Sequence, residues 1–284
     1  MPKIGIIVCG NSGIDYLDHP YDIDVFRSIL MIRDEEFTDF VDITAEDFYK
    51  RLRKEKDLVA TTAQTATGVM VEKIEKMLDK GYEEILIITI SSMLSGTYSG
   101  AVMAANMIDH AHIHVFDSKS VAYPEARMAL DAAEMAAKGK SIKDILEHLT
   151  FIRDHHGIYF SVDTLKYLVK NGRLSGASGF VGGLLKIKPL LMLTDDGRVE
   201  SIEKIRTSSK SLNRVVEKFL EDTEGKEVEA FIIHAEAENR VNDVKKELKK
   251  RRPSIGELEV YPLTPVVGAH AGPGVVALGY IEKP

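Results

Sequence analysis

Hydroxyl side chains are concentrated in one short segment of this sequence, SSMLSGTY at residues 91–98. The segment follows the apolar run ILIITI, which is typical of a strand buried on both faces, and it precedes a predicted helix. The first turn of a helix offers unpaired amides and a positive dipole end, which favour an anion. A helix cap needs only one hydroxyl, whereas four occur here beside a glycine that allows close backbone approach. We therefore predict a site for a small anion, such as a carboxylate or phosphate, formed by Ser91, Ser92, Ser95, Gly96 and Thr97.

Three further segments carry polar side chains where helices begin or end. The segment ATTAQTA precedes a helix and supplies Thr61 and Thr62, either as capping residues or as ligand contacts. The segment NGRLS closes a short predicted helix, so Arg173 is either an exposed C-terminal residue or the partner of an anion through its planar fork of donors. The segment GAHAGPG is interpreted as a rigid loop, and its composition favours a functional role for His270.

The elements that must position these segments change in character along the chain. In the first half, strands alternate with helices, which indicates β-α-β units and a parallel sheet covered on both faces. In the second half, the sequence DDG between two apolar runs predicts a hairpin, and a hairpin among helices favours a mixed or antiparallel sheet. We expect an α/β protein of two domains, residues 1–150 and residues 151–284, with a ligand between them.

The segments expected to be regular are as follows. Strands are predicted at residues 4–8, 85–90, 112–116, 157–162, 188–194, 198–205, 230–234, 257–261 and 275–281. Helices are predicted at residues 45–56, 68–80, 97–108, 125–138, 141–153, 163–170, 210–220 and 238–251, the first with Thr44 as its N-cap.

Composition limits the classes of function. Of the 284 residues, 44% are hydrophobic and 29% charged, a globular balance, and the net charge of −7 argues against a non-specific nucleic-acid partner. The single cysteine, Cys9, excludes an internal disulfide and is interpreted as a buried structural thiol. No apolar run is long enough for an integral membrane segment, and the chain does not begin with a signal-peptide pattern, so we expect a cytoplasmic protein.

The common catalytic motifs are absent from the sequence, including the dinucleotide-binding glycine pattern, the phosphate-binding loop, the zinc-protease helix and the hydrolase serine elbow. We therefore assign no catalytic residue, cofactor or metal. His110, His112 and His114 would share one face of a strand and could ligate zinc, but a polar strand edge explains them more simply.

The four polar segments, in this order, resemble the DegV family, which includes the fatty-acid-binding subunits of bacterial fatty acid kinase. The resemblance rests on TTAQT, SSMLSGTY, NGRLS and GAHAGPG, and it runs from about residue 44 to the end. It departs from the family pattern at Ala63 and Thr65, and also near the N-terminus, where CGNSG replaces an aspartate-serine turn and residues 15–42 fit poorly.

The resemblance implies two α/β domains with an acyl chain buried between them. It implies that a fatty acid carboxylate is held by Thr61 or Thr62, by Ser91 or Ser92, and by Arg173 and His270. It further implies that such a subunit presents the bound fatty acid to a separate ATP-dependent kinase subunit, which forms the acyl phosphate. The chain would then be a lipid-binding protein and not itself an enzyme.

An acyl tail requires an apolar tunnel. Two apolar segments could line such a tunnel, and we expect Phe180, Leu184 and Leu191 to contact the tail, although both segments could equally be plain core. Two alternatives stay open. The chain could be a serine-dependent acyl hydrolase with a motif serine as nucleophile and His270 as base, or a sensor for another small anion such as a phosphorylated metabolite.

Overall fold

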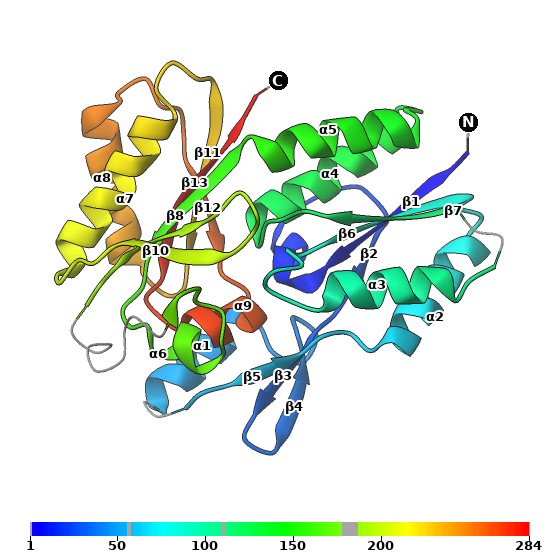
Figure 1. Cartoon of the computed structure of the whole chain (residues 1–284), viewed down its shortest axis with the longest axis horizontal. Helices are drawn as coiled ribbons and strands as arrows, with labels where there is room; N and C mark the ends of the chain where they lie inside the picture. Colours follow the sequence, from blue (N-terminus) through cyan, green and yellow to red (C-terminus); the bar gives the residue numbers. More distant parts are fainter. Residues whose placement is uncertain (1, 56–57, 110–111, 178–186, 284) are drawn as a thin grey trace.

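The computed structural model describes residues 2–55, 58–109, 112–177 and 187–283 and places them in an α/β fold of two domains, each built on its own sheet (Figure 1). The expected fold class, with a parallel sheet followed by a mixed one, is confirmed. Within the described residues, no helix is both long and apolar enough to cross a membrane.

The first sheet is parallel, in the order β2-β1-β6-β7. Its strands are β1 (Ile4–Cys9), β2 (Ile23–Phe26), β6 (Glu84–Thr89) and β7 (His112–Asp117). Its helices are α2 (Thr67–Asp79), α3 (Thr97–Asn106), α4 (Tyr123–Ala137) and α5 (Ile142–Asp154). Ile85 and Ile87 pack with α2 and α3, whereas Leu86 and Ile88 belong to the cluster that contains α4. Both faces of β6 are therefore buried, which explains why its sequence is apolar throughout.

The second sheet is mixed, in the order β10-β9-β8-β13-β11-β12, and among these neighbours only β11 and β12 run parallel. Its strands are β8 (His156–Ser161), β9 (Leu190–Leu193), β10 (Val199–Glu203), β11 (Val228–His234), β12 (Glu259–Pro262) and β13 (Val276–Glu282). The helices α7 (Ser208–Asp222) and α8 (Glu238–Arg251) cover one face. Phe160 and Ile233 on the other face join the same buried cluster as Leu86 and Ile88 of the first sheet.

A third, antiparallel sheet, β4-β3-β5, lies below the other two in Figure 1. Its strands are β3 (Ile29–Ile32), β4 (Glu35–Thr38) and β5 (Thr61–Ala63). Beside it lie the helices α1 (Ala45–Lys54), α6 (Lys166–Lys170) and α9 (Pro265–Ala271), and two 3₁₀ turns follow β1 at η1 (Gly10–Ser12) and η2 (Ile14–Tyr16). Since α9 contacts β3, β5, α1 and α6, it joins the C-terminal part of the chain to this small sheet.

Two sequence-based expectations need correction here. The segment predicted as a rigid loop at residues 268–274 begins inside helix α9, whose N-cap Thr264 accepts a hydrogen bond from the amide of Val267 and whose first residue is Pro265. The short helix predicted at residues 163–170 covers only Lys166–Lys170. The domain boundary at residue 150 stays a prediction, and it falls within α5, which packs against α4.

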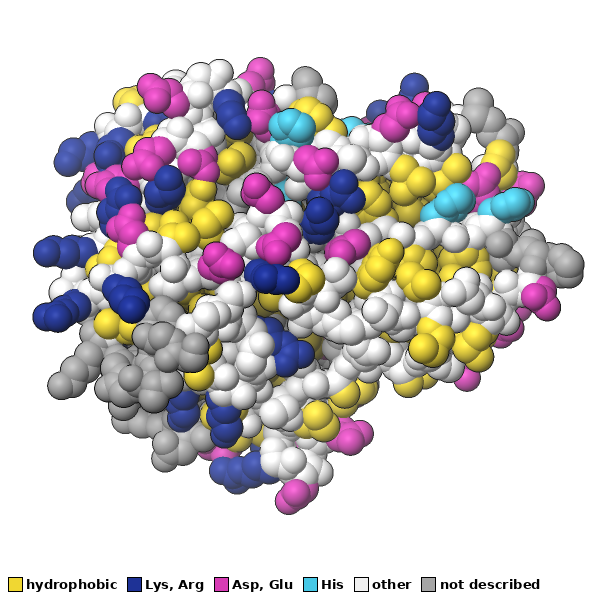
Figure 2. All heavy atoms as spheres, viewed as in Figure 1, with side chains coloured by type: hydrophobic (Ala, Val, Ile, Leu, Met, Phe, Trp, Pro, Cys, Tyr) yellow, Lys and Arg dark blue, Asp and Glu magenta, His cyan; other side chains and the backbone are white. Residues whose placement is uncertain are grey.

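Charged side chains are distributed unevenly over the face shown in Figure 2. Basic and acidic side chains are mixed on the surface over α7 and α8, whereas the surface over α3 is more apolar. Met103 of α3 and Met107 just after it are 58% and 63% exposed. The mixed charges over α8 agree with its role as an amphipathic helix with one buried and one solvated face.

Candidate functional site

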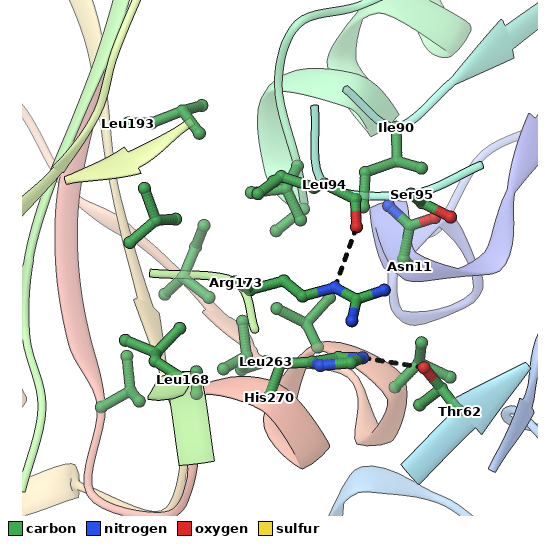
Figure 3. Close-up of a pocket in the computed structure, with 18 of the residues that line it drawn as sticks. Asn11, Thr62, Ile90, Leu94, Ser95, Leu168, Arg173, Leu193, Leu263 and His270 are labelled. Atoms are coloured by element: carbon green, nitrogen blue, oxygen red, sulfur yellow. Dashed lines mark hydrogen bonds between the residues drawn. The ribbon is translucent and has the colours of Figure 1, made fainter. Parts of the chain in front are cut away.

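A cavity lies between the inner face of the second sheet and the ends of β1 and β6 in the first (Figure 3). Its apolar lining consists of Ile90, Leu94, Val121, Ala122, Ile158, Phe160, Leu168, Leu193, Val199, Ile233, Leu263, Val266, Val267, Ala271, Val275 and Ala277. Its polar lining consists of Asn11, Ser28, Thr62, Gln64, Ser95, Thr97, Arg173 and His270. The cavity is therefore mostly apolar, and the labelled polar side chains gather at one end of it.

Thr62 and His270 meet at the polar end. The hydroxyl of Thr62, on β5, lies 2.8 Å from Nε2 of His270, on α9, and the packing of α9 against β5 brings the two together. Burial, together with the nearby Arg173 guanidinium, lowers the pKa of His270 to about 4. The imidazole is therefore neutral near pH 7, and it has one N–H to donate and one nitrogen to accept.

Arg173 projects into the same end of the cavity (Figure 3). It follows helix α6, and Gly172, with φ of 68°, supplies the left-handed backbone that ends this helix. Its Nε donates to the carbonyl of Leu94 at 3.2 Å, and its Nη1 donates to the carbonyl of Asn171. These bonds fix the guanidinium beside the loop before α3, and the side chain is still exposed to solvent.

The loop before α3 contributes Ser95, and α3 itself contributes its first residue, Thr97. Their hydroxyl oxygens lie 2.8 Å apart. Asn11, from η1, completes the polar end, and its Nδ2 donates to Oε2 of Glu125 at 2.6 Å. Burial raises the pKa of Glu125 well above its usual range. The polar end therefore combines hydroxyl, amide and neutral imidazole groups with one cation.

Four of the predicted head-group residues do not line the cavity. Ser91 is fully buried and its hydroxyl donates to the carbonyl of Gly197 at 2.8 Å. Ser92 is exposed and its amide donates to Asp117. Thr61 is exposed, since it alternates with Thr62 along β5. Gly96 precedes α3, and a Cβ there would lie 2.7 Å from Oε1 of Gln64.

The predicted tail residues have different outcomes. Phe180 and Leu184 lie outside the described residues. Leu191 is fully buried on β9 but is not part of the cavity lining, because it packs in the core beside Phe160, its partner in the sheet. The wall is formed instead by Phe160 and by Leu193, which lies two residues further along the strand.

Sequence reasoning missed Asn11, Ser28 and Gln64 as lining residues. A signal existed for Asn11, since it directly follows the end of β1, and ligands of parallel sheets bind at the carboxyl ends of strands. No group of three or more metal-ligating side chains occurs in the part of the chain that the structure describes. His114 instead has its Nε2 3.5 Å from Oε2 of Glu84, on the neighbouring strand.

This arrangement is similar to that of known proteins. The sequence profile of the DegV family of uncharacterised proteins matches residues 3–283. A DegV domain-containing protein of Staphylococcus aureus is 36% identical over 250 residues, which cover 88% of this chain and 86% of the relative. Another, from Clostridium acetobutylicum, is 30% identical over 284 residues and covers both chains completely.

The solved structures that are similar to this one are also of DegV family proteins. The structure is similar to that of a fatty-acid-binding DegV family protein from Streptococcus agalactiae, with a TM-score of 0.90, 25% identity and full coverage of both chains. It is also similar to DegV, a fatty-acid-binding protein from Bacillus subtilis, with a TM-score of 0.85, 29% identity and full coverage of both chains.

Proposed function

Because this chain belongs to the DegV family, we propose that it binds a long-chain fatty acid in the cavity between its two sheets, with the carboxylate at the polar end. The observation that carries the proposal is the division of one cavity into a long apolar part and an end with Arg173, His270 and hydroxyl groups. The names of the solved relatives, which are fatty-acid-binding proteins, support the same ligand class.

The polar end suits a carboxylate. A carboxylate that leaves water needs charge-assisted donors, and Arg173 supplies a permanent cation with several N–H groups. Thr62 and His270 bond to each other without a ligand, so both groups lie within reach of one bound oxygen. Ser95 offers a further hydroxyl on the opposite side of the guanidinium, and its oxygen lies 2.8 Å from the hydroxyl of Thr97, which also lines the cavity. We include these five residues in the proposed head-group site.

The apolar part suits an acyl tail. Each buried methylene contributes about 0.8 kcal/mol, so a sixteen-carbon tail contributes roughly 10 kcal/mol before the cost of ordering it. The alternative of a sensor for a polar anion would require a polar cavity, whereas the lining here is mostly aliphatic. The hydrolase alternative would require a serine beside His270, whereas the hydroxyl bonded to that imidazole belongs to Thr62.

We further propose that the chain acts in the cytoplasm as the substrate-carrying subunit of a fatty acid kinase. A carboxylate oxygen of the bound fatty acid would attack the γ-phosphorus of ATP held by the partner, and ADP would leave as the acyl phosphate forms. The exposure of Arg173 and Gln64 supports this role, since a partner can reach the polar end while the apolar part stays buried.

Native mass spectrometry of delipidated protein tests the binding step. We expect wild-type protein to take up one palmitate or stearate, and Arg173→Ala and His270→Ala to retain at least tenfold less because the head group loses a donor. Arg53→Ala, which removes an exposed arginine on α1, is the matched control and should bind like wild type. Wild-type protein that stays ligand-free after lipid addition would disprove the proposal.

Acyl phosphate formation with the fatty acid kinase subunit and ATP tests the presentation step. Trapping the product as a hydroxamate should show turnover with loaded wild-type protein and little with the Arg173→Ala and His270→Ala variants. Normal turnover in both variants would remove these residues from the site. Fatty acid binding without any turnover would leave the binding proposal intact and refute the kinase role.

A further inference from the structure

Leu193, the last residue of β9, separates two cavities. Besides the apolar cavity, it lines a second one between the two domains, whose other walls include Lys119, Arg153, Asp154 and His156. Among the described residues, Leu193 alone lines both cavities, and its side chain is only 6% exposed. Leu193 therefore lies between the two cavities and forms part of the partition that separates them.

The partition lies at the end of the apolar cavity away from the head group. In Figure 3, Leu193 lies at the upper left and Thr62 at the lower right, on opposite sides of the cavity. Val199, the partner of Leu193 in the β9–β10 pair, lines the same region. A tail that starts at Arg173 and follows the apolar lining would thus end near Leu193.

The second cavity is polar. Nε of Arg153 donates to Asp154 at 2.9 Å, and Nδ1 of His156 lies 2.8 Å from the carbonyl oxygen of Arg153. Asp195, in the turn after β9, adds another carboxylate. Charged groups of this kind hold water, so methylenes that passed Leu193 would lose the advantage of leaving water.

The partition is held rigidly. The turn after β9 is closed by hydrogen bonds from the amide of Thr194 to the carbonyl of Arg198 and from the amide of Gly197 to the carbonyl of Thr194, both 2.8 Å long. The Gly197 carbonyl in turn accepts the hydroxyl of Ser91, which ties the turn to the first sheet. The backbone that carries Leu193 therefore cannot shift without breaking bonds in this turn.

We infer that Leu193 is the floor of the acyl cavity and limits the length of the fatty acid that the protein accepts. This inference rests on the proposed function, because it assigns a length limit to the same cavity. The limit follows from one side chain whose size can be changed in either direction. Shortening it lets the tail occupy volume that the Leu193 side chain now fills, and enlarging it removes volume from the end of the apolar cavity.

A competition experiment tests this role. Delipidated protein is offered an equimolar mixture of saturated fatty acids from twelve to twenty carbons, and the bound species are identified by native mass spectrometry. The Leu193→Ala variant should shift the most abundant species to acids longer by about two carbons, since three side-chain carbons are removed. The Leu193→Phe variant should shift it to shorter acids. Leu220→Ala, on α7 and outside the lining of both cavities, should keep the wild-type length preference.

The outcomes separate this inference from the proposed function. An unchanged length distribution in both Leu193 variants, with normal total binding, would refute the floor and leave fatty acid binding intact. A uniform loss of all lengths in Leu193→Ala, with no shift in Leu193→Phe, would also refute it. Wild-type protein that binds none of the acids would refute the proposed function itself.

Discussion

At the scale of single residues, the polar end of the cavity depends on a carboxyl that never contacts it. Glu125, in the first turn of α4, is fully buried and accepts a hydrogen bond from Asn11, which lines the cavity. Its other oxygen, Oε1, has no hydrogen-bond partner among the described residues. Burial raises its pKa well above 4.5, because the charged form would lose its hydration. The fold therefore favours the protonated form of an acid behind the head-group site.

This raised pKa predicts how stability changes with pH. The stabilising contribution of neutral Glu125 is fully present below pH 4.5, where the unfolded chain is also protonated, and it is lost as pH rises through the pKa of the folded state. Glu125→Gln keeps the shape without a titrating group. We expect urea denaturation to show that the variant gains stability relative to wild type between pH 5 and pH 8.

The Glu125→Gln experiment needs a control variant at an exposed carboxylate. Glu147→Gln, at a side chain 68% exposed on α5, should follow the wild-type pH profile. Parallel profiles of wild type and Glu125→Gln from pH 5 to pH 8 would show that Glu125 is not held neutral by the fold.

At the scale of elements, the β9–β10 turn contacts the loop after β6 through Gly197, and a larger residue at this position would clash with Ser91. Gly197 has φ of 84°, and a Cβ there would lie 2.1 Å from Oγ of Ser91 and 3.0 Å from the carbonyl of Lys119. We expect Gly197→Ala to destabilise the protein by about 2 kcal/mol or more, through backbone strain and overlap. Ser91→Ala should cost about 1 kcal/mol, because a buried carbonyl loses its donor.

Thermal and chemical denaturation of the single and double variants measure this coupling. The double variant Ser91→Ala/Gly197→Ala should be less destabilised than the sum of the two, since removing the hydroxyl makes room for the new methyl group. Strictly additive effects would mean that the turn does not rest on Ser91. Such a result would also weaken the rigid support proposed for Leu193.

The sequence predicts long elements well and short ones poorly. Helix α8 has the predicted bounds, Glu238–Arg251, because its apolar residues recur at helical spacing. Strands β2, β3, β4 and β5 were not predicted, since each has only three or four residues, and β3 and β5 pair across a long sequence separation, as Met31 does with Thr61. Helix α9 was hidden by its internal glycine, Gly268.

The candidate site could also be predicted only in part from the sequence. Thr62, Arg173 and His270 were proposed from their segments, and the structure brings all three to one cavity. A count of hydroxyls, however, cannot tell which of them faces a ligand. The hydroxyl of Ser91 points to Gly197, while Ser95 and Thr97 line the cavity. This depends on the path of a loop and on a turn 106 residues further along the chain.

At the scale of the whole molecule, the cavity lies within a single buried cluster shared by the two domains. Ile88 of the first sheet and Ile233 of the second belong to that cluster, and the cavity walls come from both. A ligand in this position contacts both domains at once. Its binding free energy therefore stabilises the arrangement of the domains as well as the local site, as for any ligand that binds only the folded state.

Thermal unfolding of delipidated protein with and without palmitate measures this effect. A ligand at one hundred times its dissociation constant adds about 2.7 kcal/mol, which corresponds to a rise in Tm of roughly 5 °C for a chain of this size. The methyl ester of palmitate has the same tail but no charge for Arg173 to pair with, so it should raise the Tm less. In the Arg173→Ala variant the acid and the ester should give similar, smaller shifts. Equal shifts with acid and ester in wild-type protein would mean that the tail alone determines binding and that the polar end does not hold the carboxylate.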